Sequence, residues 1–140
     1  MIDAETGWYA VPTTLKAVVV SPLREILLAR NHRDEWELPG GWPAVEDVST
    51  EDVLRREVLE ETGLHVSPGP LLHAELVVVA GSQVMVVAYI CFAHAQALNL
   101  SSEHTDLMWA PADALPHLEL DAYQRAISEA SAYVGPGTTG

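Results

Sequence analysis

The first apolar positions of the chain fall in two short runs of aliphatic and β-branched residues, Leu15–Val20 and Glu25–Ala29. Ser21 and Pro22 interrupt them, and a proline at such a place is typical of a turn or a strand end. The pattern therefore predicts a strand, a turn and a second strand. Residues 1–14 show no regular alternation, and we expect them to form an irregular lead-in.

From Ser49 onward, apolar residues recur at the three- and four-residue spacing of one helix face. The stripe includes Val53, Leu54 and Val58. Serine is a favoured residue for capping the start of a helix. Gly63 is well placed to end the helix in a left-handed turn. The pattern predicts a helix between Ser49 and Gly63.

Two longer apolar runs follow, Leu71–Ala80 and Val84–Ala93, and residues 81–83 (Gly-Ser-Gln) between them predict a β-hairpin. The segment Pro68–Pro70 just ahead of them is expected to break the chain. Because both runs are almost continuously apolar, we expect the two strands to be covered on both faces.

The last third of the chain is predicted to hold a short strand around Leu107–Trp109, a turn at 111–115 and a terminal helix over Leu120–Tyr133. Residues 134–140 are expected to form a loose tail. Strands, a helix, more strands and a final helix in this order predict one α/β domain over residues 1–140, with a sheet layered between helices.

Composition and charge narrow the class of function. The 140 residues are 49% hydrophobic and carry a formal net charge of −13, with one cysteine, Cys91. Such an acidic surface repels polyanions and argues against a protein that binds nucleic acid through its phosphates. The longest apolar run, Val84–Ala93, is too short for the roughly 20 residues that span a bilayer. A single cysteine is compatible with a reducing cytoplasm, where we expect the protein to be.

Three glutamates, Glu57, Glu60 and Glu61, lie at positions i, i+3 and i+4 of the predicted helix, so their carboxylates share one face. Two unit charges ~6 Å apart repel by about 0.7 kcal/mol in bulk water and about 3 kcal/mol at an effective dielectric constant of 20. A hard divalent cation such as Mg²⁺, which prefers oxygen ligands, would offset this repulsion. Acidic helix faces are commonly just solvated, so the three glutamates alone leave both interpretations open.

The stretch Gly41–Leu64 resembles the signature of the Nudix hydrolase superfamily, G-x5-E-x7-R-E-U-x-E-E-x-G-U, where U is aliphatic. Its second half, Arg56–Leu64, reads REVLEETGL and is a full match, and the preceding WELPGG is similar to the usual lead into the motif. The first half departs from the pattern, because Asp47 stands where a glutamate is usual and the spacing to the arginine is one residue longer. Either Glu46 or Asp47 is expected to take the part of the upstream acid.

The resemblance implies a Nudix-type α/β/α sandwich with a mixed central sheet. It also implies hydrolysis of the diphosphate linkage in a nucleoside diphosphate linked to another moiety, with Mg²⁺, or Mn²⁺ in its place, and an activated water. The metal ligands that it implies are the carbonyl of Gly41 and the carboxylates of Glu57, Glu60 and Glu61. Glu60 and Glu57 are also implied as catalytic residues, with Arg56 orienting a glutamate.

A further carboxylate often comes, in this family, from a loop over the site. The loop ahead of the last predicted strand resembles that place, and Glu103 is the favoured auxiliary ligand or base, with Asp106 second. Arg30 and Arg33 stand just ahead of WELPGG and are candidates to bind substrate phosphates, and Trp36 is a candidate to stack on a base. Exposed acids, arginines and tryptophans also occur on loops without such roles.

The motif leaves the substrate open. The lead-in is too short for the additional N-terminal sheet typical of many ADP-ribose hydrolases, which favours a nucleoside triphosphate or a small nucleotide conjugate. The alternatives are a nucleoside diphosphate sugar pyrophosphatase of the ADP-ribose type and a non-catalytic Nudix-like domain that senses a nucleotide. Isomerase chemistry would need a cysteine in the pocket, whereas Cys91 lies in a predicted strand. The expected partner is a small-molecule nucleotide, with no nucleic acid and no membrane, and a homodimer is compatible with the sequence.

Overall fold

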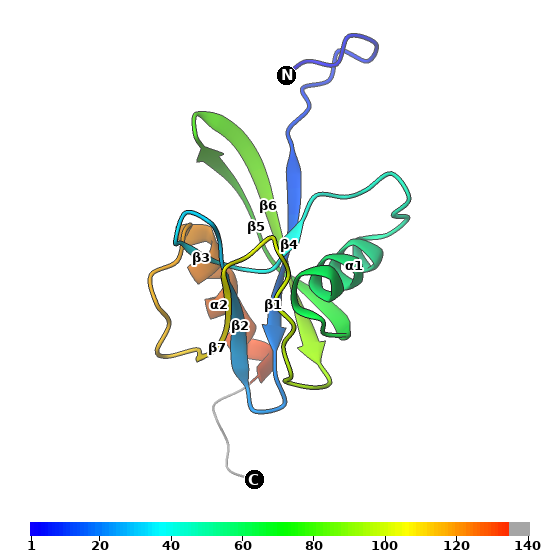
Figure 1. Cartoon of the computed structure of the whole chain (residues 1–140). Helices are drawn as coiled ribbons and strands as arrows, with labels where there is room; N and C mark the ends of the chain where they lie inside the picture. The colour runs from blue at the N-terminus through cyan, green and yellow to red at the C-terminus, as the bar shows by residue number, and fades with distance from the viewer. Residues whose placement is uncertain (135–140) are drawn as a thin grey trace.

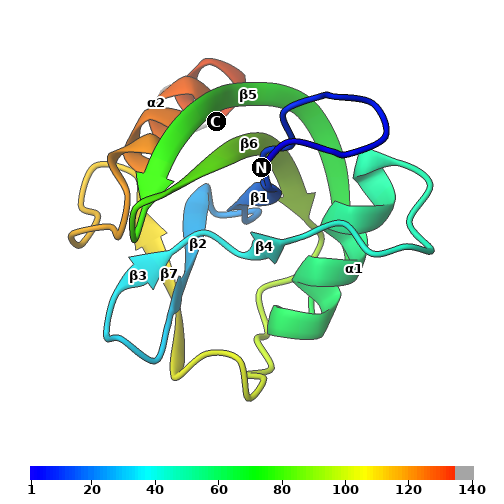
Figure 2. The ribbon, with the colours of Figure 1, turned by 90° about the horizontal axis from the view of Figure 1, so that it is seen from above.

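The computed structural model describes residues 1–134, in which a mixed β-sheet lies between two helices (Figure 1). The helices are α1 (Thr50–Thr62) and α2 (Asp121–Val134), and Figure 2 shows them on opposite sides of the sheet. The strands are β1 (Thr13–Val20), β2 (Glu25–Arg30), β3 (Trp36–Glu37), β4 (Gly40–Gly41), β5 (Val66–Val79), β6 (Ser82–Ala93) and β7 (Asp106–Pro111). The predicted α/β/α sandwich is confirmed.

The sheet is built around β1. Its strands follow the order β3-β2-β1-β6-β5, with β4 paired to β1 and β7 paired to β2. β1 and β6 run parallel, whereas the other pairs are antiparallel. The sheet is therefore mixed, as predicted.

The two faces of β1 belong to two separate cores. Ala17 and Val19 pack with the buried face of α1, whereas Val18 and Val20 pack with that of α2. A strand that is buried on both faces reads as a continuous apolar run. Lys16 interrupts this run, and because side chains alternate along a strand, it shares the face of Val18 and Val20.

The predicted start and end of α1 are confirmed. The Ser49 side chain accepts a hydrogen bond from the backbone N–H of Asp52 at 3.1 Å. Gly63 has a φ of 76°, and its N–H donates to the Leu59 carbonyl at 2.9 Å. Such a left-handed residue costs little when it is glycine, so the chain can leave the helix here and enter β5.

The corner before α1 is a two-residue strand, which the sequence did not predict. Gly40 and Gly41 pair with Lys16 and Leu15 of β1. Gly40 has a φ of 144°, and a Cβ atom there would lie 2.1 Å from the Leu15 carbonyl oxygen. Only glycine fits this approach of two backbones, which places Gly41 between β1 and α1.

The β5–β6 hairpin differs from its prediction in three respects. β5 begins at Val66 and runs through Pro68–Pro70, with register shifts against β6 at Pro68 and after Leu71. The turn is Ala80-Gly81, with φ values of 50° and 81°, and not residues 81–83. Strand pairing already resumes at Ser82, because two residues with positive φ are enough to reverse the chain.

The expectation that both hairpin strands are covered on both faces is wrong for β5. Leu76 and Val78 are 47% and 68% exposed. β5 is an edge strand, and Figure 1 shows the tip of the hairpin rising beyond both helices. Leu76 and Val78 lie on the same face of β5, and within residues 1–134 no other layer covers that face near the tip of the hairpin. Apolar composition alone does not reveal which face of a strand is left uncovered.

The lead-in ahead of β1 holds little regular structure. The lead-in contains a single bridge between Ile2 and Tyr9, and β1 begins two residues earlier than predicted. Of the tail predicted for residues 134–140, Val134 ends α2 and the remainder lies outside the described residues. Within residues 1–134, neither helix is long and apolar enough to cross a membrane.

Candidate active site

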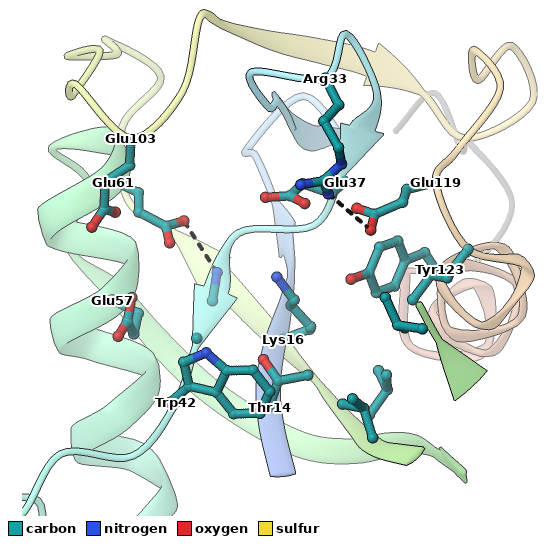
Figure 3. Close-up of a pocket in the computed structure, with 16 residues that line it drawn as sticks. Thr14, Lys16, Arg33, Glu37, Trp42, Glu57, Glu61, Glu103, Glu119 and Tyr123 are labelled. Atoms are coloured by element: carbon teal, nitrogen blue, oxygen red, sulfur yellow. Dashed lines mark hydrogen bonds and ion pairs between the residues drawn. The ribbon is translucent and has the colours of Figure 1, made fainter. Parts of the chain in front are cut away.

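A pocket of about 510 Å³ opens between α1 and the start of α2, across β1 and the glycine corner (Figure 3). One end carries Glu57, Glu61 and Glu103, and we call these three residues the glutamate cluster. The other end, which we call the far end, carries Arg33, Glu37, Glu119 and Tyr123. Figure 3 shows Thr14 and Lys16 between them. The remaining lining residues are Gly40, Gly41, Trp42, Val79, Val84, Val86 and Leu120.

The glutamate cluster brings together one carboxylate oxygen from each of Glu57, Glu61 and Glu103, all within 4.8 Å of one another. Two come from α1 and the third from the loop ahead of β7. Asp106, the second candidate from that loop, lies in β7 outside the pocket lining, and its carboxylate accepts from the N–H of Leu107 at 2.8 Å. Hard divalent cations prefer such converging carboxylates, so these residues fit an ion such as Mg²⁺.

Glu61 is the most deeply placed of the three, at 4% exposed. The N–H of Gly40 donates to its Oε2 at 3.2 Å. Burial raises the pKa of Glu61 to about 8, although the nearby Lys16 opposes this shift. A buried carboxyl of this kind is charged at neutral pH when a cation lies beside it, because the opposite charge favours the ionised form.

Arg56 is held by the upstream acid, and that acid is Asp47. Its Nη2 and Nε donate to the two oxygens of Asp47 at 2.7 and 3.2 Å, and Nη2 also donates to the Trp42 carbonyl at 3.3 Å. The Arg56 guanidinium lowers the pKa of Asp47. Glu46 is exposed, and no hydrogen bond of its side chain is found in residues 1–134. The two-pronged pair fixes the loop between β4 and α1 against the helix.

Arg56 also connects two of the motif glutamates. Its Nη1 donates to Glu57 Oε1 at 3.0 Å and reaches Glu60 Oε2 at 3.5 Å. Glu60 is 53% exposed and lies outside the glutamate cluster. The structure therefore brings Glu57 and Glu61 together directly, and joins Glu60 to them through Arg56.

Gly41 lies close to the Glu57 carboxylate. A Cβ atom at Gly41 would lie 2.7 Å from the Glu57 carboxyl carbon. The backbone therefore passes the Glu57 carboxylate at a distance that a larger residue would prevent. The backbone of Gly41 therefore lies beside one of the predicted carboxylate ligands.

Lys16 is a pocket residue that sequence reasoning missed. It is 7% exposed, its Nζ donates to the Leu38 carbonyl at 3.1 Å, and it lies 5.7 Å from the centre of the Tyr123 ring. A charged residue inside an apolar strand is rarely buried without a partner. The lysine within the run LKAVVV was therefore a signal that could have indicated a site.

The two acids of the far end, Glu37 and Glu119, were also missed, and they are held differently. Burial would raise the pKa of Glu37, but hydrogen bonds from His104 and Asn31 and the charge of Lys16 bring it down to about 2. The distances are 2.8 Å from His104 Nε2 and 3.3 Å from Asn31 Nδ2. Burial and a hydrogen bond with Glu37 raise the pKa of Glu119 to about 7.

The predicted substrate-binding residues separate into two groups. Arg33 lines the far end of the pocket, where its Nη2 donates to Glu119 Oε1 at 3.3 Å. Neither Arg30 nor Trp36 lines the pocket, and their role in binding substrate stays a prediction. Arg30 pairs with Asp34 across the β2–β3 turn, and Trp36 packs against the core under α2. Trp42, beside the glutamate cluster, is the tryptophan that lines the pocket.

Comparison with known proteins agrees with this geometry. A family model, the NUDIX domain, matches residues 12–130. No curated protein matches the sequence. Among solved structures, the MutT protein from Methanosarcina mazei Go1 is similar with a TM-score of 0.75 and 20% identity, over 90% of this chain and 96% of that one.

Two further solved structures are similar over most of their length. An ADP-ribose pyrophosphatase from Streptococcus suis 89-1591 has a TM-score of 0.69 and 25% identity, over 87% of this chain and 92% of that one. The NUDIX domain of Shewanella oneidensis NrtR, solved with ADP ribose, has a TM-score of 0.76 and 22% identity, over 95% of this chain and 94% of that one. Because the family model covers most of the chain, the protein belongs to the NUDIX domain family.

Proposed function

We propose that this protein hydrolyses the diphosphate linkage of a nucleoside diphosphate joined to another moiety, and that it needs Mg²⁺ to do so. The observation that carries the proposal is the glutamate cluster at one end of a nucleotide-sized pocket. Three acidic groups so close together repel unless a cation lies among them. Mg²⁺ usually binds to one or two carboxylates together with substrate phosphates, so the same ion would also attract the diphosphate.

Glu57, Glu60, Glu61 and the Gly41 carbonyl are the proposed metal ligands, with Mn²⁺ able to replace Mg²⁺. When bound, the ion would polarise the phosphoryl oxygens and lower the pKa of a coordinated water. The closeness of Gly41 to Glu57 supports this assignment because it puts backbone beside a proposed carboxylate ligand. The burial of Glu61 supports it because a bound cation would keep that carboxylate ionised.

The other residues position the chemistry. Arg56 holds Glu57 and Glu60 from one side and is itself fixed by Asp47. Glu103 is the proposed auxiliary ligand or base, because its carboxylate belongs to the glutamate cluster and is exposed to incoming water. Lys16 and Arg33 line the rest of the pocket and supply positive charge for a phosphate.

A nucleoside triphosphate or a small nucleotide conjugate is the favoured substrate. The pocket volume of about 510 Å³ falls in the usual range of roughly 300–1,000 Å³ for small-molecule sites. The lead-in forms one bridge and adds no strand to the sheet. A pyrophosphatase of the ADP-ribose type is the alternative. The cytoplasmic location and a homodimer stay predictions.

The test is a screen of phosphate release from nucleoside triphosphates, nucleoside diphosphate sugars and dinucleoside polyphosphates, in Mg²⁺ and in EDTA. We expect turnover that EDTA abolishes and that Mg²⁺ or Mn²⁺ restores. Phosphorus NMR in isotopically labelled water would then identify the phosphorus that is attacked. Tight nucleotide binding without any turnover would contradict the proposal and support a sensing domain.

A further inference from the structure

The three carboxylates of the glutamate cluster are held in different ways. Glu57 accepts a hydrogen bond from Arg56 at 3.0 Å, and Glu61 accepts one from the N–H of Gly40 at 3.2 Å. For the Glu103 carboxylate, no hydrogen bond or ion pair is found in the part of the chain that the structure describes. Its position therefore depends on the backbone that carries it.

The backbone that carries Glu103 is held in place through the next residue, His104. His104 is 6% exposed, and its Nε2 lies 2.8 Å from Glu37 Oε1. Its other ring nitrogen, Nδ1, is buried and has no hydrogen-bond partner in residues 1–134. Within these residues, the contact with Glu37 is therefore the only hydrogen bond of the His104 ring. A buried polar group is stabilised mainly by the hydrogen bonds that it keeps, which makes this contact the determinant of where His104 sits.

Glu37 is a fixed anchor for the ring. It lies in β3, in register with Ala29 of β2, and its second carboxylate oxygen accepts from Asn31 Nδ2 at 3.3 Å. The hydrogen bonds and the charge of Lys16 keep Glu37 ionised. An ionised acceptor binds a donor more strongly than a neutral one. The contact between His104 and Glu37 therefore ties the loop ahead of β7 firmly to the sheet.

Other hydrogen bonds also hold this loop, among them those from the Thr105 hydroxyl to the carbonyls of Arg30 and Asn31. The N–H of Thr105 donates to the Arg30 carbonyl at 2.9 Å, and the exposed His32 ring lies 3.0 Å from the Ser102 carbonyl. Both fix the loop beside Glu103 but neither is a buried side-chain contact with an ionised group.

We propose that His104 is a positioning residue, which holds the loop against Glu37 so that the Glu103 carboxylate reaches Glu57 and Glu61. The inference rests on the proposed function, because it concerns the geometry of the proposed metal site. Residues that orient metal ligands from behind typically change metal affinity or activity by about 10–100-fold when they are replaced.

The test measures Mn²⁺ affinity without substrate, from the electron paramagnetic resonance of free Mn²⁺. His104→Leu is expected to weaken binding about tenfold or more. His104→Gln, which keeps an N–H donor able to reach Glu37, should restore most of that loss. The matched control is His73→Leu, because His73 contacts Glu75 at 2.7 Å in the same kind of pair but far from the pocket, and it should leave the affinity unchanged.

A double-mutant cycle separates positioning from general loosening of the fold. If His104 acts through Glu103, Glu103→Gln should cost less Mn²⁺ affinity in the His104→Leu background than in the wild type. If His104→Leu does not fold, His104→Asn, whose shorter amide falls short of Glu37, replaces it in the comparison with His104→Gln.

The Mn²⁺ measurements distinguish failure of the positioning role from failure of the proposed function. Equal Mn²⁺ affinity in the wild type and His104→Leu, or fully additive effects in the cycle, would overturn the positioning role and leave the proposed function intact. A wild-type protein that takes up no Mn²⁺ would overturn both.

Discussion

The two ends of the pocket are both acidic, but the protein compensates them differently. At the far end, Glu37 receives hydrogen bonds from His104 and Asn31, and its pKa is about 2. In the glutamate cluster, burial outweighs the contacts that Glu61 makes, and its pKa is about 8. The number of acids is therefore a poor guide to a cation site. Both acids of the far end contact a basic side chain, whereas in residues 1–134 only Glu57 of the glutamate cluster forms such a pair.

The largest effect is expected from replacing a proposed metal ligand. Glu57→Gln and Glu60→Gln should each lower kcat by about a hundredfold or more, because each removes charge that a metal and its water need. Steady-state kinetics in saturating Mg²⁺ measures this. Glu75→Gln, which alters a surface pair with Arg125, is the control and should change kcat less than about twofold. Near wild-type rates for Glu57→Gln would mean that the glutamate cluster does not carry the reaction.

The two glycines of the corner should separate stability from activity. Gly40→Ala should lower the free energy of unfolding by about 3 kcal/mol or more, because a Cβ meets the β1 backbone at a positive φ. Gly41→Ala should leave stability within about 1 kcal/mol but lower kcat about tenfold, because the added methyl displaces the Glu57 carboxylate. Urea denaturation and kinetics on both variants check this, and equal loss of stability in the two would contradict it.

The stability of the metal-free protein should depend on pH. The pKa of Glu61 in the folded protein, about 8, lies above its ordinary value of 4.5, so the folded state binds more protons than the unfolded state between these values. The free energy of unfolding should therefore fall as pH rises from 4.5 to 8, by an amount on the order of 3 kcal/mol. Glu119 adds to the fall up to pH 7 or so.

Denaturation at several pH values, with EDTA or Mg²⁺, measures this dependence. Glu61→Gln should remove most of it, and Mg²⁺ should stabilise the protein more at pH 8 than at pH 6, because metal ligands must be deprotonated. A profile in EDTA that is as steep in Glu61→Gln as in the wild type would show that another group is responsible.

The smallest effect concerns the arginines ahead of the corner. Arg33→Ala should raise KM a few-fold, because Arg33 lines the pocket, although its side chain is 67% exposed and its charge is screened. Arg30→Ala is the matched control and should leave KM unchanged, because Arg30 pairs with Asp34 outside the pocket. A larger effect of Arg30→Ala than of Arg33→Ala would reverse the assignment.

The parts of the site that are local in sequence could be predicted. α1 begins after Ser49 and ends before Gly63 because capping and apolar spacing act within a few residues. The motif glutamates follow from the same helix only in part, because their spacing places all three on one face but does not show that Glu60 stays exposed outside the glutamate cluster.

The rest depends on contacts between distant segments. Lys16 and Glu37 meet because β1, β3 and β4 come together in the sheet, and Glu119 joins them from the loop ahead of α2. Arg30 and Trp36 lie outside the pocket lining, because Arg30 pairs with Asp34 and Trp36 packs against the core. The pattern of residues along the chain does not show which distant residues these side chains contact.

The Asp47–Arg56 pair has a consequence for recognising related chains. The connection from the glycine corner to the helix is one residue longer than the signature, yet its acid still reaches the arginine with both oxygens. Loops usually tolerate insertions when their ends stay anchored. A search that demands a fixed interval between the two halves would overlook such chains, whereas one that asks for any acid able to meet the arginine would retain them.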